Sequence, residues 1–409
     1  MSHAASEPPL GPAATAATAA DLPLLCQEVF SSLARSDQRR WGEIYVRGLL
    51  TTPGRKSIRN ISDHVVGWRA DQCLQQFVNQ SPWECEPVRR ALARLVAGAL
   101  RPQAWVVKEV IFPKNGSSSV GVARQYAHSA GRVLNCQIGI AVFLVGAGGS
   151  CPVNWRLLLP RSWDADPGRR RRAHLPDHER HLPRWQPLLD AIDEMTADWG
   201  LPRVPVIADL REEPRVEPVL RGLEERRISY VLRVAESRPA VTVHSSGSPP
   251  RTLSLGEVAG VPARPGTITL SGPHDSPARP GRSHLVAKPL PSGPRPGCGP
   301  RAAGPRYVVT EWPLRRRRPP ATWLTTLESQ RLADLPDQFA LHEQVAADMA
   351  RLNDALGLRH FEGRSFRGWH HHVTLVSIAH ASQLLARLQP AGHAPGRLGP
   401  LAAGIGALA

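Results

Sequence analysis

Between residues 104 and 235, apolar runs of strand length and helical patterns follow one another in an order that strongly constrains the fold. Three runs rich in β-branched and aromatic residues come first, WVVKEVIF, NCQIGIAVFLVG and VNWRLLLP. A helical pattern from about Trp185 to Trp199 follows, and then a short apolar strand, VPVIAD, that ends on Asp209. A second helical pattern, PRVEPVLRGLEERR, leads to a last strand, SYVLRVA. This order predicts an α/β fold whose mixed sheet begins antiparallel and continues parallel.

The segment before the sheet, residues 22–100, is expected to be a helical domain that binds DNA. LLCQEVFSSL has helical apolar spacing, and Ser36-Asp37 is a suitable cap for the helical pattern that follows. Thr52-Pro53-Gly54 ends that helix, and the next one begins with three basic residues, Arg55, Lys56 and Arg59. A helix that opens on basic residues suits phosphate contact, although an ordinary solvated helix end accounts for the pattern equally well.

The rest of the chain is organised around an insertion dense in Pro, Gly, Ser and Arg, residues 236–305, with two short strand candidates, VTVH and TITL. A strand, RYVVTEW, is expected to begin at Arg306, and the basic run 315–318 is expected in a turn. A long helical region is expected from about Asp337 to Leu388. The tails, residues 1–21 and 389–409, are expected to be disordered. Residues 101–388 therefore form the predicted core.

The charge of the chain favours a polyanionic partner. The formal net charge is +16 and the pI is about 10.7, although the excess of Arg over Lys also fits the codon bias of a GC-rich genome. Six cysteines without a C-x-x-C pair argue against a zinc ribbon or a disulfide framework. The longest apolar run has strand length, and the first twenty residues lack the pattern of a signal peptide, so a cytoplasmic protein without a membrane span is expected.

Asp209 is the residue that most clearly suggests chemistry. Cutting a phosphodiester with two metal ions requires about three carboxylates on adjacent strands and a neighbouring helix. An acid at the end of a buried strand fits that requirement, and a helix cap or turn residue is the competing interpretation.

Several blocks of sequence carry a more specific signal. They are FPKNGSSSVGVARQY (112–126), NCQIGI (135–140), LLLPRSW (157–163), VIAD (206–209), YVLRV (230–234) and GLRHFEGRSFRGWHHHVTL (357–375). In this order and spacing they resemble bacterial insertion-sequence transposases of the DDE (RNase H-like) superfamily. The resemblance covers roughly residues 24–235 and 306–385.

The resemblance implies an RNase H-like mixed β-sheet core with an N-terminal helical domain and a Pro/Gly-rich insertion. It implies a protein that binds double-stranded DNA at transposon ends, nicks it and joins the 3′-hydroxyl to a target. Mg²⁺ or Mn²⁺ is the implied cofactor if the protein is active. The resemblance also implies a cytoplasmic, nucleoid-associated location. It leaves open whether the protein forms a homodimer.

The implied set of three catalytic acids is only partly present. The first Asp position holds Lys108, the second keeps Asp209, and the third, a Glu on a helix, holds Ala346. A lysine at the first position repels a divalent ion. Glu109 could replace the first acid only if a bulge re-aimed it, because neighbouring strand residues point to opposite faces. Glu343, three residues before Ala346, could replace the third after a shift of one turn.

The candidate site residues follow from these considerations. Asp209, Glu109 and Glu343 are the catalytic candidates, and Asp209 and Glu109 are the metal ligands among them. The residues expected to contact DNA are basic residues in the matched blocks: Arg55, Lys56, Arg59, Lys114, Arg124, Arg364 and His370. The run 370–372 of three histidines cannot hold one metal, because consecutive helix residues diverge by about 100°. For these histidines, DNA contact or solvent exposure is expected.

Three hypotheses remain at this point. The first is a transposase-family protein that binds DNA and whose cleavage is impaired or lost. The second is an active metal-dependent transposase that uses Glu109, Asp209 and Glu343. The third is a transposase scaffold that carries unrelated enzymatic chemistry, since a fold does not fix a function.

Overall fold

The computed structural model describes residues 22–66, 70–243, 251–260, 268–272, 283–290, 305–313 and 321–388. The two expected disordered tails and the basic run 315–318 lie outside these residues, as does much of the insertion. None of the helices described is both long enough and apolar enough to cross a membrane.

The N-terminal segment is helical, as its patterns predict. A helix over residues 22–29 is followed by α2 (Ser36–Thr51), α3 (Ile58–Ile61) with a π-helical continuation (Ser62–Val66), α4 (Asp71–Asn79) and α5 (Cys85–Leu100). The side chain of Ser57 accepts a hydrogen bond from the backbone N–H of Asn60 and so caps α3. The helices α2, α4 and α5 contact the rest of the protein, and the domain boundary at residue 100 stays a prediction.

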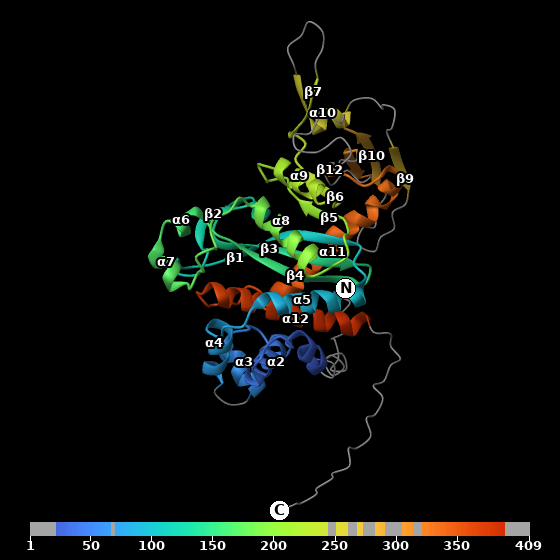
Figure 1. Ribbon diagram of the computed structural model, residues 1–409. Helices are drawn as coiled ribbons and strands as arrows, with labels where there is room; N and C mark the ends of the chain where they lie inside the picture. The colour runs from blue at the N-terminus through green and yellow to red at the C-terminus, as the bar shows by residue number, and fades with distance from the viewer. Residues whose placement is uncertain are drawn as a thin grey trace, which may run out of the picture.

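One large sheet forms the centre of the molecule (Figure 1). Its first part comprises β1 (Ala104–Pro113), β2 (Ala123–Ala127), β3 (Arg132–Gly146), β4 (Gly149–Leu158), β5 (Val206–Asp209) and β6 (Tyr230–Val234). β1 pairs antiparallel with β3, and β3 with β4, whereas β1, β5 and β6 are parallel neighbours. The prediction of a mixed sheet with an antiparallel start and a parallel continuation is confirmed.

The sheet continues beyond β6 with strands that the sequence patterns predicted only in part. They are β9 (Ile268–Gly272), β10 (Ser283–Pro289), β11 (Tyr307–Pro313) and β12 (Ala321–Thr325), in the spatial order β6-β12-β11-β10-β9. A separate hairpin pairs β7 (Pro239–Val243) with β8 (Arg251–Ser254), and α10 (Leu255–Gly260) follows it. The described part of the insertion therefore adds β9 and β10 to the central sheet. The strands β2, β8, β10 and β12 were not predicted from the sequence.

Helices cover both faces of the sheet. The short helices α6 (Arg161–Asp164) and α7 (Pro167–Arg172) follow β4, and α8 (Trp185–Asp193) packs on β3 and β4 with α9 (Glu217–Glu225) beside it. On the opposite face lie α5, α11 (Leu335–Asp354) and α12 (Phe366–Leu388). In Figure 1 α12 lies between the sheet and the helices α2 and α4, both of which it contacts.

The expected long helix from Asp337 to Leu388 is wrong in one respect, because residues 355–365 separate α11 from α12. Gly357 adopts a left-handed backbone conformation with φ of 67°, which ends the helical path and favours glycine. A Cβ atom at Gly357 would also lie 2.6 Å from the side chain of Lys56. The helix therefore breaks because of Gly357, which lies in the 357–375 block that carries the family resemblance.

The start of α12 packs against the sheet through Trp369. Its indole forms edge-to-face contacts with Phe112 of β1 and Trp155 of β4, at centroid distances of 5.5 and 6.3 Å. A Cβ at Gly139 of β3 would lie 3.0 Å from that indole, so glycine permits the close approach. The centre of the core is thus aromatic and joins three strands to one helix.

Two histidines of the run at the start of α12, His371 and His372, are buried, which corrects the expectation of solvent exposure for them. His371 and His372 are fully buried, and Tyr45 of α2 donates a hydrogen bond to Nδ1 of His372 over 3.0 Å. Nε2 of His372 lies 3.1 Å from the carbonyl oxygen of Leu358. The run joins α12 to the N-terminal helices, because its imidazoles bond to groups of those helices and of the 355–365 segment.

Candidate functional site

Lys108, in the middle of β1, lies at the centre of a group of charged side chains. β1 and β5 pair in parallel through Val107 and Ala208, so the next residues, Lys108 and Asp209, project from the same face. Asp209 pairs in register with Arg233 of β6, which projects from that face as well. The carboxyl ends of parallel strands are the usual place for a site in such sheets.

Helix α11 covers this face and contributes His342. The ammonium of Lys108 lies 2.8 Å from Nε2 of His342, so the imidazole accepts a hydrogen bond when Lys108 is charged. Burial lowers the pKa of Lys108 to about 8, and the charge of Asp209 opposes that effect. The ammonium is therefore mainly protonated at pH 7.

The carboxylate of Asp209 is held by arginines. The guanidinium of Arg211 donates to both carboxylate oxygens, with the shortest distance 2.8 Å to Oδ2, and Nη1 of Arg233 lies 3.9 Å from Oδ2. Burial raises the pKa of Asp209, but the hydrogen bonds and charge of Arg211 outweigh burial and lower it below its usual range. Asp209 is therefore an ion-paired carboxylate.

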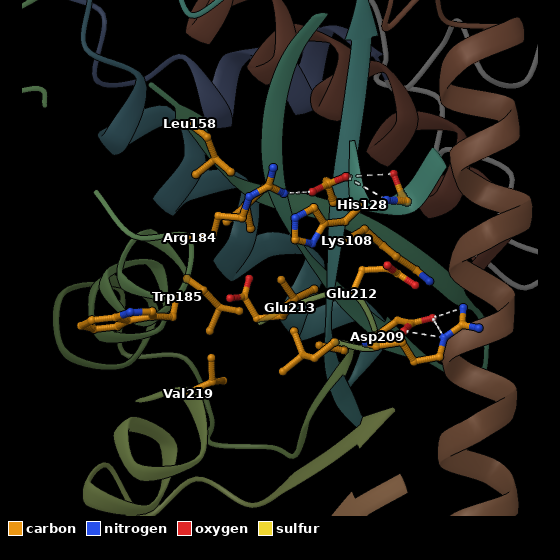
Figure 2. A pocket seen from close by; sticks show the side chains of 17 residues that line it. Lys108, His128, Leu158, Arg184, Trp185, Asp209, Glu212, Glu213 and Val219 are labelled. Atoms are coloured by element: carbon orange, nitrogen blue, oxygen red, sulfur yellow. Dashed lines mark hydrogen bonds and ion pairs between the residues drawn. The ribbon is translucent and has the colours of Figure 1, made fainter. Parts of the chain in front are cut away.

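Glu109 lies on the other face of the sheet. The register of β1 with β3 is continuous from Ala104 to Pro113, so no bulge re-aims Glu109. Its carboxylate accepts hydrogen bonds from the backbone and hydroxyl of Ser129, at 3.0 and 3.1 Å, and pairs with Arg184 at the start of α8. In Figure 2 Arg184, the ion-pair partner of Glu109, lies apart from Lys108 and Asp209. Glu109 and Asp209 line the same cavity, but each carboxylate pairs with its own arginine, Arg184 and Arg211. Their joint role as metal ligands stays a prediction.

Glu343 and Ala346 lie on α11. Glu343 is half-buried, and its charge acts on Lys108. Its catalytic role stays a prediction. Ala346, at the third acid position, is exposed and offers only a methyl group. Glu343 lies about one helical turn before Ala346, and its charge acts on the ammonium of Lys108.

A cavity of about 260 Å³ opens beside this group (Figure 2). Lys108, Asp209 and Arg211 line one part of it, and Arg184 and Trp185 of α8 line another. Glu109, Glu212 and Glu213 also line it, and Glu212 accepts a hydrogen bond from Tyr126 over 3.3 Å. Solvent and small anionic or cationic groups therefore have access to Lys108.

Comparison with known proteins settles the family. The sequence model of the DDE superfamily endonucleases matches residues 28–265, more than half of the chain. The chain belongs to the DDE superfamily endonucleases. A probable transposase for insertion sequence element IS701 from Microchaete diplosiphon is 29% identical over 116 residues. That match spans 28% of this chain and 30% of the relative, so the chain matches less than a third of the relative's length.

Membership of the DDE superfamily endonucleases confirms the predicted RNase H-like α/β fold and the transposase-type family. The matched residues include Lys108 and Asp209 and end before α11. The assignment of Ala346 to the third acid position therefore rests on the motif alone.

DDE superfamily endonucleases typically use divalent metal ions, and the residues present do not fit such a centre. The Lys108 ammonium stands where the first acid would bind, and both oxygens of Asp209 accept hydrogen bonds from Arg211. Within the described ranges, no three His, Cys, Asp or Glu side chains are arranged to hold a metal. Coulomb repulsion from Lys108 and Arg211 opposes a cation next to Asp209.

The seven residues expected to contact DNA fall into two groups. Arg55, Arg59, Arg124 and Arg364 are exposed, although Arg55 is paired with Glu362. The other three are Lys56, Lys114 and His370.

These three bond to the protein itself, and their contact with DNA stays a prediction. Lys56 is buried and donates to the carbonyl oxygen of Thr52, and Lys114 donates to that of Phe361 over 2.6 Å. His370 lies against Arg89. Their ammonium and imidazole groups therefore join segments of the chain.

The sequence analysis missed His342, Arg211 and Arg233 as members of the site. Arg211 follows Asp209 by two residues, a spacing that permits an ion pair, and this signal was available. His342 is 234 residues from Lys108, and no sequence pattern connects the two. Arg233 could have been found only from the register between β5 and β6.

Proposed function

We propose that this protein is a DNA-binding member of the transposase branch of the DDE superfamily endonucleases and that its metal-dependent DNA cleavage is impaired or lost. In this proposal it binds double-stranded DNA at the ends of an insertion sequence. It acts in the cytoplasm at the nucleoid, and two copies hold the two ends of one element.

One observation carries the proposal. Lys108 projects into the position of a metal-binding acid, and its ammonium lies beside Asp209 and within the electrostatic range of Glu343. Two-metal cleavage places ions about 4 Å apart among converging carboxylates, and a fixed cation there opposes them. The pairing of Glu109 with Arg184 on the opposite face argues against the active alternative that uses Glu109.

DNA binding is supported by charge and exposure. The chain has a formal net charge of +16, and Arg55, Arg59, Arg124 and Arg364 present guanidinium groups at the surface. Guanidinium groups suit the oxygens of backbone phosphates, and phosphate neutralisation accounts for most non-specific DNA affinity.

Binding and cleavage are measured separately to test the proposal. Labelled duplexes that tile the DNA on both sides of the gene are incubated with the purified protein and with Mg²⁺ or Mn²⁺. We expect a gel shift of these duplexes without nicked product, and the same result for Asp209→Ala. Asp177→Ala, an exposed acid just after α7, is the matched control.

Two outcomes would contradict the proposal. Metal-dependent nicking by the wild type that disappears in Asp209→Ala and persists in Asp177→Ala would show retained cleavage. No gel shift at moderate salt would remove DNA binding and leave the scaffold open to other chemistry.

A further inference from the structure

A cleft of about 390 Å³ lies at the opposite end of β5 from Asp209. It is lined by residues 203–205, which precede β5, by Gln103 before β1, and by residues of the segment 331–338, where α11 begins. Helix α11 packs on β1 and β5, so the cleft lies where this helix and both strands start. We name it the Gln338 cleft. Small-molecule sites have volumes of roughly 300 to 1,000 Å³, so the cleft is large enough for such a ligand.

Gln338 is the residue of this cleft that indicates a ligand. It is 5% exposed, and its Oε1 has no hydrogen-bond partner among the described residues. Its Nε2 makes no hydrogen bond within the same ranges. An amide that is buried without partners costs free energy, because both of its polar groups have lost water. A ligand that presents one acceptor beside one donor restores both hydrogen bonds.

The edge of an adenine base has this arrangement. Nε2 of Gln338 donates and Oε1 accepts, and adenine presents the acceptor N7 beside the donor N6. Guanine presents two acceptors, N7 and O6, on the same edge, so Oε1 would stay without a donor. Val204 and Pro205 line the cleft as well and supply apolar surface for the ring. The Gln338 cleft is therefore suited to adenine and discriminates against guanine.

The charged side chains of the cleft suit the rest of a nucleotide. Arg331 and Asp334 pair with each other at 3.3 Å, so their charges are balanced. Arg203 and Asp337 are exposed, and neither has an ion-pair or hydrogen-bond partner for its side chain in the part of the chain that the structure describes. A guanidinium binds phosphate oxygens, and a carboxylate accepts hydrogen bonds from ribose hydroxyls.

We propose that the Gln338 cleft binds a free adenine ribonucleotide, whose base pairs with Gln338, whose ribose bonds to Asp337 and whose phosphate is bound by Arg203. The site is separate from Lys108 and does not depend on the proposed DNA binding. Helix α11 connects the two places, because His342, the hydrogen-bond partner of Lys108, lies about one turn after Gln338. DNA lacks the 2′-hydroxyl, so the contact with Asp337 favours a ribonucleotide over DNA.

Isothermal titration calorimetry of the full-length protein with adenosine 5′-monophosphate (AMP) in EDTA tests the proposal. The wild type is expected to bind AMP. It is expected to bind the guanine analogue GMP and the 2′-deoxy analogue dAMP about tenfold more weakly, because each loses one hydrogen-bonded contact with the cleft.

Variants of the base contact and the phosphate contact give different results. Gln338→Leu keeps most of the volume and removes the amide, so AMP binding is expected to weaken about tenfold or more. The urea midpoint of the unliganded variant should not fall, because an unsatisfied buried group is removed. Arg203→Ala is expected to weaken AMP binding about tenfold and to leave the affinity for adenosine, which has no phosphate, unchanged.

Two further variants complete the set. Asp337→Ala is expected to remove the preference for AMP over dAMP, since its only role in the proposal is the ribose contact. Arg221→Ala removes an exposed arginine of α9 that does not line the Gln338 cleft. It is the matched control for Arg203→Ala and should keep the wild-type affinity for AMP.

Three outcomes would overturn the proposal. The first is wild-type protein that binds no AMP at millimolar concentration. The second is equal AMP affinity of the wild type and of folded Gln338→Leu and Arg203→Ala variants, which would place the nucleotide elsewhere. The third is a single-stranded oligodeoxyadenylate that displaces AMP and binds more tightly than AMP, which would assign the cleft to DNA.

Discussion

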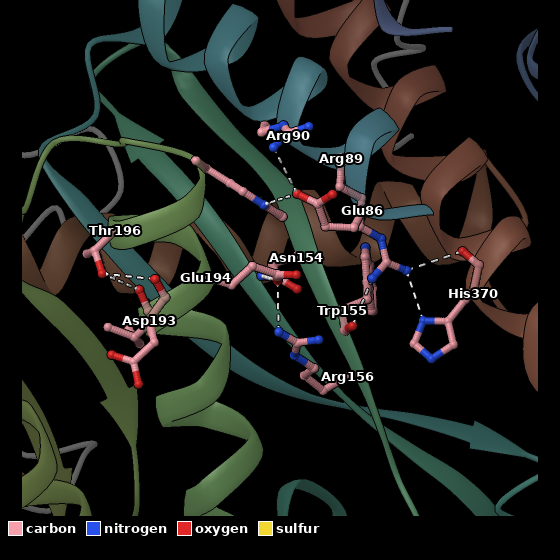
Figure 3. Close-up of polar contacts among 12 residues, drawn as sticks. Glu86, Arg89, Arg90, Asn154, Trp155, Arg156, Asp193, Glu194, Thr196 and His370 are labelled. Carbon is pink, nitrogen blue, oxygen red and sulfur yellow. Dashed lines mark hydrogen bonds and ion pairs between the residues drawn. The ribbon is translucent and has the colours of Figure 1, made fainter. Parts of the chain in front are cut away.

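Replacing Arg89 by alanine is expected to lower the free energy of unfolding by about 3 to 4 kcal/mol. The guanidinium is buried and donates to Oγ1 of Thr374 over 2.8 Å. It also donates to the carbonyl oxygen of Trp155 and to Nδ1 of His370, each over 3.0 Å (Figure 3). Without the guanidinium these acceptors lose their donor where burial limits access of water. The variant no longer has to bury the charge of Arg89, and this saving in free energy offsets part of the loss. Urea unfolding at neutral pH measures the difference.

The neighbour of Arg89 supplies the control. Arg90 is on the same helix, half exposed, and pairs with Glu86 at 3.7 Å across one turn. Arg90→Ala is expected to change the free energy of unfolding by less than about 0.5 kcal/mol. Equal stabilities of Arg89→Ala and Arg90→Ala would show that the cost of desolvating the Arg89 guanidinium cancels the free energy that its hydrogen bonds contribute. Arg89→Met, which keeps most of the buried volume, is expected to lose less stability than Arg89→Ala.

Acidification is expected to destabilise the protein through His372. Burial lowers the pKa of its imidazole to about 4, against an ordinary value of 6.5. Above pH 6.5 neither the folded nor the unfolded state binds the proton, so stability does not depend on this group there. Between pH 6.5 and 4 the unfolded state takes up the proton and the folded state does not, so stability falls as pH falls. At pH 5 the loss is about 2 kcal/mol for this one residue.

A comparison of two variants measures that contribution. His372→Gln removes the titrating group, and its free energy of unfolding should change less between pH 7.5 and pH 5 than that of the wild type, by about 2 kcal/mol. His178→Gln changes a histidine whose side chain is 81% exposed and should leave the pH dependence as it is in the wild type. The same pH dependence in wild type and His372→Gln would refute the assignment.

The strands that carry the site could be predicted because their signals are local. The apolar runs of β1, β3, β5 and β6 are bounded by turn residues, and a strand that ends on Asp209 needs no knowledge of distant contacts. The opposite facing of Lys108 and Glu109 also follows from the two-residue period of a strand. The family motif then identified Lys108 as the replaced acid.

The partners of these residues could not be predicted, because they come from distant segments. His342 reaches Lys108 from another helix, and Arg184 reaches Glu109 from the opposite face of the sheet. The histidine run was misread for a related reason. Polar residue types suggest exposure, and only the packing of α2, α4 and the sheet around α12 shows that His371 and His372 are interior.

The position of α12 has a consequence for how the chain is made on the ribosome. Most residues of α12 are buried, and they lie between β4 on one side and α2 and α4 on the other. The helices α2 and α4 are therefore synthesised long before α12, the helix that covers their apolar faces. A stop codon before Phe366 would release a chain whose first helices and central sheet both lack their common partner, so we expect such truncated products to aggregate or to be degraded.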